Sequence, residues 1–357
     1  MPNILIVAGD GIGPEIMNEA KRVLDCFAGE IDFTMTERLI GGAAIEATGS
    51  PFPAETQEAA QKADAVLLGA VGGPKWDNLP LAERPEKGLL AIRKTLGLYA
   101  NLRPLSIWPQ LAAFSPLRPE LLQNVSFTIV RELTGDVYFG EPRGVRTDEN
   151  GKRTAFNTMV YSEDEIRRIA KVAFDLARKS RKKVCSIDKS NVLESMRFWR
   201  EIVEEEHKAY PDIELSHLYV DNASMQIIRQ PSSFDIMLTP NMFGDILSDE
   251  AAVLSGSLGL LPSASIGGKS ALFEPIHGSA PDIAGQGLAN PIGMILSAAM
   301  MLELSFDRAD LGGKIRAAVA AALDKGLRTA DIASEGTTRV STQEMGTAIV
   351  EGVKAGR

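Results

Sequence analysis

Two carboxylates stand four residues apart, at Asp245 and Asp249, just after a turn that opens a predicted helix. At that spacing both side chains lie on one face of the helix. Two like charges there repel each other unless a cation lies between them. Mg²⁺ or Mn²⁺ would fit, since both bind carboxylate oxygens, and Asp221 at the end of a predicted strand could supply a third. The same spacing also fits a helix without a metal, in which one carboxylate interacts with the helix dipole at the N-terminus and the other is solvated. Both interpretations, a metal site and an ordinary helix start, stay open.

Lys189 also follows a predicted strand end. A lysine that is desolvated at such a place can act as a base. The alternative is an exposed lysine at the start of a helix, with no role in catalysis. The three histidines lack the spacing of metal ligands, and only His277 stands out, through its Gly-Ser-rich neighbours.

Glycines 9, 11 and 13 follow an apolar run and precede a helical pattern, which suggests dinucleotide binding. The spacing is G-x-G-x-G, however, and no acidic residue about 20 positions later closes a second strand. From spacing alone, a tight strand-to-helix turn is therefore the favoured interpretation of these glycines. Residues 266–270 resemble the end of a phosphate-binding loop, but Ser263 stands where that motif needs glycine, so we reject the match.

Alternating strands and helices must position these side chains. Apolar runs predict strands at residues 4–8, 65–69, 126–130, 184–187, 218–220 and 234–238, with an alternating strand at 31–35. Helical spacing predicts helices after residues 14 and 191, from about residue 244, and over 292–304 and 314–326. This order predicts an α/β protein with a largely parallel or mixed sheet, whose ligands gather beyond the carboxyl ends of the strands.

The segment from Asp136 to Ser162 breaks this alternation. It is polar, and Asn150-Gly151 between short extended runs predicts a hairpin. A hairpin that projects from an α/β body often serves as an oligomerisation arm.

Composition excludes several classes of protein. The 357 residues are 45% hydrophobic and 24% charged, as in ordinary globular proteins, and suffice for two domains. The net charge of −9 opposes binding to nucleic acid or to an anionic membrane surface. Cys26 and Cys185 are too few for a disulfide scaffold. We expect a cytoplasmic protein, because no signal peptide or membrane-length apolar run is present.

Six segments together resemble one family, the β-decarboxylating dehydrogenases that act on isopropylmalate, isocitrate, homoisocitrate, tartrate and D-malate. They are residues 9–15, 100–104, 130–135, 138–144, 241–249 and 277–285. The likeness runs from Ile4 to about Gly346, and Arg84 to Arg93 resembles the members that oxidise 3-isopropylmalate. The family implies a fold that is not the standard Rossmann fold. Residues 1–98 and 256–357 would form a discontinuous cofactor-binding domain, and 99–255 a substrate, metal and dimerisation domain whose arm is the hairpin at about 136–162.

The resemblance also implies a role for individual residues. Lys189 would take the hydroxyl proton and Tyr138 would later protonate the enol carbon. The remaining residues fall into three groups: Arg93, Arg103, Arg131, Asp221, Glu86, Leu89, Leu90 and Val192 at the substrate; Asp221, Asp245 and Asp249 at Mg²⁺ or Mn²⁺; and Ile12, Glu274, His277, Gly278, Ser279, Ala280, Asp282, Ile283 and Asn290 at NAD. Lys189, Asp221 and Val192 would come from the partner in a homodimer.

The expected reaction is NAD-dependent oxidation and decarboxylation of a malate that carries an alkyl group on carbon 3. Two alternatives remain at this point. The first is a dehydrogenase of the same family acting on D-malate, tartrate or isocitrate. The second is a catalytically silent, NAD-binding regulatory subunit, against which the presence of Lys189, Tyr138 and the three aspartates speaks.

Overall fold

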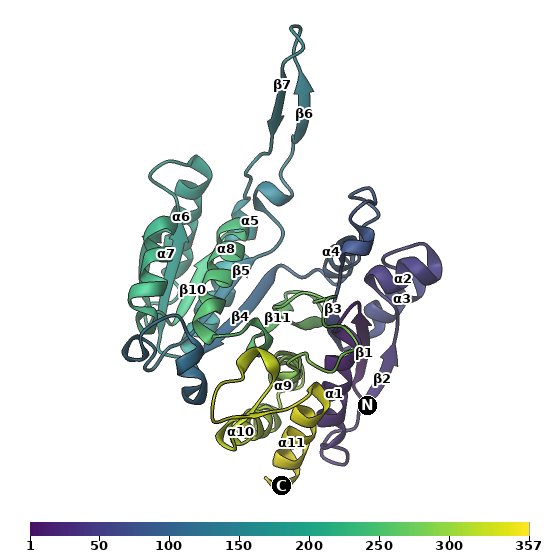
Figure 1. Ribbon diagram of the computed structural model, residues 1–357. Coiled ribbons are helices and arrows are strands. Elements are labelled where there is room, and N and C mark those ends of the chain that lie inside the picture. The colour runs from purple at the N-terminus through teal and green to yellow at the C-terminus, as the bar shows by residue number, and fades with distance from the viewer. Residues whose placement is uncertain (357) are drawn as a thin grey trace. The chain divides into compact units, whose positions relative to one another are not determined.

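The computed structural model describes residues 1–356, which divide into two compact units. Unit 1 comprises residues 1–98, residues 108–116 and the chain from Ser255 onward. Unit 2 comprises residues 99–107 and 117–254. Each unit is an α/β structure with mostly parallel strands, which confirms the predicted class (Figure 1). The roles predicted for the two domains stay predictions.

Unit 1 holds five strands in the order β2-β1-β3-β12-β11, in which only the β11–β12 pair is antiparallel. Its strands are β1 (Asn3–Gly9), β2 (Thr34–Glu37), β3 (Ala65–Ala70), β11 (Pro262–Ile266) and β12 (Ala271–Pro275), with a separate short pair, β13 (Leu327–Arg328) and β14 (Thr338–Arg339). Its helices are α1 (Gly13–Asp25), α2 (Gly41–Thr48), α3 (Ala54–Lys62), α4 (Glu86–Thr95), α9 (Ile292–Ser305), α10 (Ala309–Asp324) and α11 (Thr342–Ala355).

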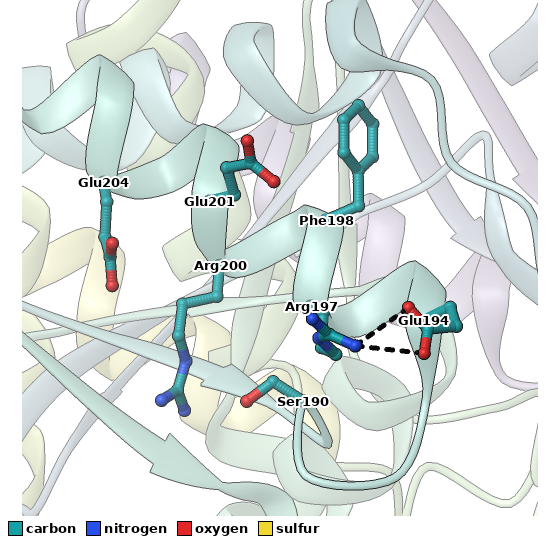
Figure 2. Close-up of a pocket in the computed structure, with 7 residues that line it drawn as sticks. All are labelled: Ser190, Glu194, Arg197, Phe198, Arg200, Glu201 and Glu204. Atoms are coloured by element: carbon teal, nitrogen blue, oxygen red, sulfur yellow. Dashed lines mark hydrogen bonds and ion pairs between the residues drawn. The ribbon is translucent and has the colours of Figure 1, made fainter.

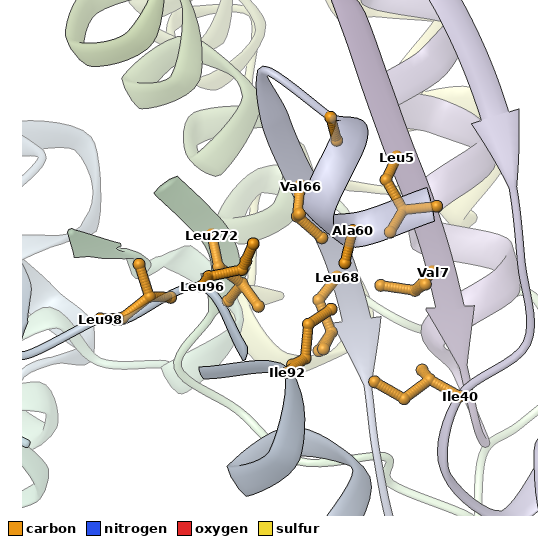
Figure 3. Close-up of a cluster of buried hydrophobic side chains, with 11 residues drawn as sticks. Leu5, Val7, Ile40, Ala60, Val66, Leu68, Ile92, Leu96, Leu98 and Leu272 are labelled. Atoms are coloured by element: carbon orange, nitrogen blue, oxygen red, sulfur yellow. The ribbon is translucent and has the colours of Figure 1, made fainter. Parts of the chain in front are cut away.

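The core of unit 1 lies on both faces of these strands. On one face Leu5, Val66 and Leu68 pack against Ala60 of α3 and Ile92 of α4 (Figure 3). On the other face lies α9, whose residues from Ile292 to Leu302 are all buried and which contacts β3, β11 and β12. Helix α9 contains the most apolar stretch of the sequence, and the fold uses it as a core helix. Within residues 1–356, the structure contains no helix with the length and apolarity that a membrane crossing requires.

Unit 2 holds five strands in the order β4-β5-β10-β8-β9, in which only the β4–β5 pair is antiparallel. Its strands are β4 (Ala100–Ser106), β5 (Ser126–Glu132), β8 (Lys183–Asp188), β9 (Glu214–Tyr219) and β10 (Ile236–Thr239), with a separate hairpin of β6 (Gly144–Thr147) and β7 (Arg153–Phe156). Its helices are α5 (Glu163–Arg178), α6 (Glu194–His207), α7 (Val220–Arg229) and α8 (Asn241–Ala252).

Successive side chains of β8 point to opposite faces of the strands of unit 2, and a different pair of helices lies on each face. Ser186 accepts a hydrogen bond from the indole of Trp199 on α6, at 3.2 Å. Cys185, the neighbour in the strand, instead lines a cavity together with Gln226 of α7. Because successive side chains of a strand point to opposite faces, α6 and α7 cover opposite faces of the strands. Helix α5 packs beside α6, and α8 beside α7.

The predicted hairpin is present and projects from unit 2 (Figure 1). Its two strands are joined by a loop in which Asp148 N–H donates to the Lys152 carbonyl at 2.9 Å, and Gly151 adopts a φ of +76°. Nearly all residues of both strands are exposed. The strands of the hairpin therefore pack little against the rest of unit 2, and the role of the hairpin as a dimerisation arm stays a prediction.

Some predicted boundaries were wrong. The strand expected at 218–220 is β9, which ends at Tyr219, so Asp221 lies in the first turn of α7 and not at a strand end. Glu274, which is expected to bind NAD, lies in strand β12 and not in the loop that follows it. The glycines of the rejected phosphate loop, 267 and 268, form the turn between β11 and β12, and no helix follows. That rejection is therefore confirmed.

Candidate active site

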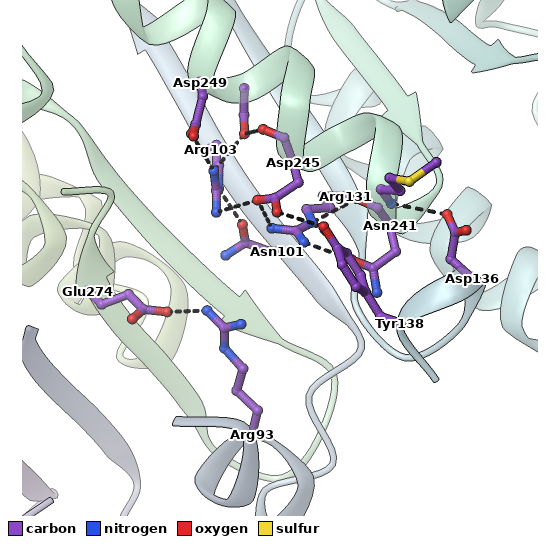
Figure 4. Close-up of polar contacts among 12 residues, drawn as sticks. Arg93, Asn101, Arg103, Arg131, Asp136, Tyr138, Asn241, Asp245, Asp249 and Glu274 are labelled. Atoms are coloured by element: carbon purple, nitrogen blue, oxygen red, sulfur yellow. Dashed lines mark hydrogen bonds and ion pairs between the residues drawn. The ribbon is translucent and has the colours of Figure 1, made fainter. Parts of the chain in front are cut away.

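Arg103 and Arg131 extend from the antiparallel strands β4 and β5 of unit 2 toward the start of α8 (Figure 4). Arg131 is almost fully buried. Its Nε and Nη2 donate to the Asn241 side-chain oxygen at 3.1 and 2.8 Å, and its Nη1 donates to Asp245 Oδ1 at 2.5 Å. Arg103 donates from Nε to Asn101 at 2.8 Å and from Nη1 to Ser248 at 2.6 Å. These bonds fix both planar guanidinium groups in one orientation each.

Asp245 and Asp249 lie on consecutive turns of α8, as their spacing predicts. The Arg103 guanidinium lies between them, with Nη1 3.4 Å from Asp249 Oδ1 and Nη2 3.7 Å from Asp245 Oδ1. This cation relieves the repulsion between the carboxylates. Asp249 nevertheless keeps 70% of its side-chain surface exposed and Asp245 keeps 38%, so oxygens of both remain accessible to a ligand.

Tyr138 completes this group of side chains. Its hydroxyl donates to Asp245 Oδ2 at 3.0 Å, and its ring lies 5.9 Å from the Arg131 guanidinium. Burial raises the pKa of the Tyr138 hydroxyl, and the negative charge of Asp245 raises it further. The hydroxyl therefore stays protonated at neutral pH and can donate a proton.

The buried carboxylate of Asp136 holds the backbone near this group of side chains. Asp136 has a φ of +72° and no exposed surface, and its Oδ2 accepts the Met242 N–H at 3.0 Å in the first turn of α8. Asn241 N–H donates to the Tyr161 hydroxyl at 2.8 Å. The start of α8, which carries Asp245, is thereby attached to the turn that carries Tyr138.

Lys189 and Asp221 form a second polar group of unit 2. Lys189 Nζ donates to Asp221 Oδ1 at 2.7 Å, and this bond lowers the pKa of the Asp221 carboxyl. Val192, which follows in the same loop, is 68% exposed. Over residues 1–356 the structure contains no group of three or more His, Cys, Asp or Glu side chains that could hold a metal ion. Within one chain, Asp221 is thus occupied by Lys189 rather than joined to Asp245 and Asp249.

Unit 1 carries the third arginine of the predicted set. Arg93 on α4 donates from Nη2 to Glu274 Oε1 of β12 at 2.6 Å, and both side chains are largely buried (Figure 4). The Arg93 Nε is buried without a hydrogen-bond partner.

The other predicted residues of α4 differ in their surroundings. Leu89 is partly buried and packs against the core cluster of unit 1, whereas Leu90 is 37% exposed. Glu86 is exposed at the first turn of the helix, close to Gly72. Of the two leucines, Leu90 is therefore the one whose side chain is available to a ligand.

The glycine turn after β1 is joined to the loop after β12. Ile12 N–H donates to the Ser279 carbonyl at 2.8 Å, and Gly11 approaches the same residue so closely that a Cβ would collide with it. Gly11 also adopts a φ of +56°, which favours glycine. These glycines therefore make a tight turn and a close backbone contact with the loop after β12.

The loop after β12 carries the remaining residues predicted to bind NAD. Gly278 and Asp282 are exposed, whereas Ser279 is buried, and Ala280 and Ile283 are half-buried. Burial lowers the pKa of His277, so its ring is neutral at pH 7, and its Nε2 is buried without a partner. A bound group could satisfy that nitrogen, which makes this loop compatible with a cofactor.

Asn290 is less available than predicted. Its Oδ1 accepts the Ile292 N–H at 3.0 Å at the start of α9, and its Nδ2 donates to Asp331 at 3.0 Å. Both ends of this amide already have partners within the protein.

Several residues of the site escaped sequence reasoning. Asn101, Asn241 and Ser248 bond the two arginines, and Asp136 holds the start of α8. Asn101, Asn241 and Ser248 lie within the segments that carry the family resemblance. An uncharged side chain in a motif, however, does not indicate which charged side chain it will bond. The positive φ of Asp136 cannot be read from the sequence either.

Comparison with known proteins gives a consistent result. The family model described as isocitrate/isopropylmalate dehydrogenase matches residues 3–349. A 3-isopropylmalate dehydrogenase from Hahella chejuensis is 59% identical over 97% of this chain and 97% of its own length. An enzyme of the same name from Aquifex aeolicus is 57% identical over 98% of this chain and 97% of its own.

Solved structures of similar fold carry related names. An isocitrate dehydrogenase from Methylococcus capsulatus matches with a TM-score of 0.87 and 36% identity, covering 99% of this chain and all of its own. A β-decarboxylating dehydrogenase from Thermococcus kodakarensis, solved in its apo form, matches with a TM-score of 0.80 and 35% identity, covering 99% and 97% of the two chains.

Proposed function

Because the chain belongs to the isocitrate/isopropylmalate dehydrogenase family, we propose that it oxidises (2R,3S)-3-isopropylmalate with NAD and decarboxylates the product. Its products are 4-methyl-2-oxopentanoate, the 2-oxo acid that precedes leucine, and CO₂. The strongest support is the 59% identity to an enzyme of that name over 97% of the chain. A D-malate, tartrate or isocitrate dehydrogenase and a silent regulatory subunit are not favoured, since the curated relatives share the isopropylmalate name.

Substrate binding would fall to the arginines. The guanidinium groups of Arg103 and Arg131 are planar forks that suit carboxylates, and their orientation is fixed by amide and hydroxyl partners. Arg93 would bind a carboxylate in the same way, in exchange for Glu274. On α4, Leu90 offers an apolar surface for the isopropyl group, with Glu86, Leu89 and the partner's Val192 as the further residues of that pocket.

Two groups would move protons. Lys189 would accept the proton of the substrate hydroxyl while the carbon that bears it is oxidised, a step for which NAD supplies the oxidising power. After CO₂ leaves, Tyr138 would protonate carbon 3 of the resulting enol, because its hydroxyl carries a proton at neutral pH.

The carboxylate oxygens of Asp245 and Asp249 fit a divalent cation such as Mg²⁺ or Mn²⁺. Bound there, with the partner's Asp221 as a third ligand, the metal would polarise the ketone oxygen and ease the loss of CO₂. In that case the residues of one chain supply only part of the site.

A homodimer would complete the site, and the surface of α7 and α8 supports this. These neighbouring helices expose Met225 (53%), Ile228 (37%) and Ile246 (60%), and Val253 just after α8 is 54% exposed. Exposed apolar groups of this kind mark interaction surfaces. A second copy, related by a twofold axis, would cover the same surface on both chains.

Initial rates with different malates test the proposed function. We expect 3-isopropylmalate to be the best substrate, other 3-alkylmalates to follow, and D-malate and then isocitrate to be poorer, with one CO₂ released per NADH. NADP should be roughly a hundredfold poorer than NAD, because its 2′-phosphate would meet the exposed carboxylate of Asp282 and no cation at Ile283. Equal efficiency with isocitrate or D-malate would contradict the proposed substrate.

A further inference from the structure

The turn that carries Lys189 is held by a carboxylate on one side. Asp188, the last residue of β8, has no exposed surface. Its Oδ1 accepts the backbone N–H of Ser190 at 2.9 Å. Asp188 and Ser190 flank Lys189 in the sequence, so this bond fixes the backbone on both sides of the lysine. The Lys189 carbonyl in turn accepts the N–H groups of Val192 and Leu193, both at 3.0 Å.

An arginine of α6 holds this carboxylate with both arms of its fork. Arg200 donates from Nε to Asp188 Oδ2 at 2.8 Å and from Nη2 to Oδ1 at 3.1 Å. Such a bidentate pair fixes direction as well as distance, which a lysine in the same place could not do. The turn after β8 is thereby attached to the second turn of α6.

Lys189 and Arg200 both lie near the ring of Tyr219. The Arg200 guanidinium lies 5.4 Å from the centre of the Tyr219 ring, and Lys189 Nζ lies 6.0 Å from it. Tyr219 is also the strand partner of Asp188 in the register of β8 and β9. The Lys189 amine is therefore placed by this ring, by Asp221 at 2.7 Å and by the backbone that Asp188 fixes.

We propose that Asp188 and Arg200 are positioning residues for Lys189, and that they set the direction in which its amine meets the substrate hydroxyl. This inference rests on the proposed function for the role of Lys189, while the contacts themselves do not. A displacement of a reacting group by about 1 Å can lower a rate up to about a hundredfold, so loss of the fork should be visible in kcat.

A second arginine of α6 provides a matched control. Arg197 lines the same surface groove as Arg200 and Ser190 (Figure 2) and is 66% exposed, and among residues 1–356 its ion-pair partner is Glu194 of its own helix, at 3.2 Å. Replacing it removes the same charge from the same helix and leaves the bonds between Arg200 and Asp188 in place.

Three variants separate positioning from general stability. Arg200→Lys keeps the positive charge beside Asp188 but loses the fork, Arg200→Met loses both, and Arg197→Met is the control. Each is measured for melting temperature, for kcat and KM with 3-isopropylmalate and NAD, and for the rate at which acetic anhydride modifies Lys189, followed by mass spectrometry of the peptide.

The inference predicts that Arg200→Lys melts near the wild type, that its kcat falls roughly tenfold or more with an unchanged KM for NAD, and that Lys189 is acetylated several times faster. Arg197→Met should match the wild type in all three. Should Arg200→Met fail to fold, Arg200→Lys alone decides. An unchanged acetylation rate in Arg200→Lys overturns the inference whatever happens to kcat, whereas a wild type that does not turn over 3-isopropylmalate contradicts the proposed function instead.

Discussion

At the scale of single residues, the charged groups of the proposed site neutralise one another within each unit. Arg103 lies between Asp245 and Asp249, Arg93 pairs with Glu274, and Lys189 pairs with Asp221. Each pair combines a predicted ligand-binding group with a counter-ion from the same unit. For Arg93 and Glu274, which are both largely buried, pairing spares the protein the cost of a buried charge without a partner.

Tyr138→Phe tests the protonation step. The variant keeps the ring beside Arg131 and loses only the hydroxyl that bonds Asp245. We expect kcat with 3-isopropylmalate to fall roughly a hundredfold, the usual scale for loss of a general acid, and KM to change little. Steady-state kinetics measure both, and a kcat equal to that of the wild type would remove Tyr138 from the proposed mechanism.

His277 gives a prediction about pH. Burial lowers its pKa in the folded protein below the ordinary value of 6.5, although Asp331 opposes this shift. The unfolded chain therefore binds the proton more readily, and His277 destabilises the fold as the pH drops below about 6.5. Relative to His277→Gln, the melting temperature of the wild type should fall between about pH 8 and about pH 5.5. A difference between the two proteins that does not change with pH would contradict this.

At the scale of elements, the strongest sequence patterns were the reliable ones. The apolar runs of β1, β3 and β8 and the helical spacing after residue 191 predicted their elements within a few residues. These patterns follow directly from burial on both faces of a parallel sheet and on one face of a helix.

The β11–β12 pair shows what such patterns cannot supply. Strand β11 contains serines, which bond to backbone carbonyls when buried, as Ser263 does with Glu274 at 3.0 Å. Strand β12 has a partner that is far away in the sequence, because it pairs with β3, about 200 residues earlier. Helix α5, in contrast, had a usable signal in the capping box of Ser162 and Glu165.

Leu90 allows a test of the substrate pocket at helix α4. Leu90→Ser removes exposed apolar surface without disturbing the core. We expect kcat/KM for 3-isopropylmalate to fall about tenfold, equivalent to about 1.4 kcal/mol, and that for D-malate to change much less. Lys87→Ser, also exposed on α4, is the control. Leu89→Ser should instead lower the melting temperature, because Leu89 packs on the core. Equal losses with both substrates in Leu90→Ser would argue against the pocket.

At the scale of the whole molecule, we propose that one active site draws residues from two copies of the chain. Within one chain, Lys189 and Asp221 form one polar group and Asp245, Asp249, Arg103 and Arg131 form another, and no third acidic residue joins the two aspartates of α8 in residues 1–356. No local pattern could predict this, because a sequence indicates which groups are present and not which chain completes a site.

Complementation between inactive variants tests this claim most directly. Lys189→Ala and Asp245→Ala are each expected to be inactive as homodimers. After exchange of subunits, verified by native mass spectrometry, each mixed dimer would contain one intact site and one site that lacks both groups. We predict that NADH formation from 3-isopropylmalate returns in the mixed dimers, at about half of the wild-type activity per dimer when the two sites act independently. Mixed dimers that form and remain inactive would contradict a site shared between two chains.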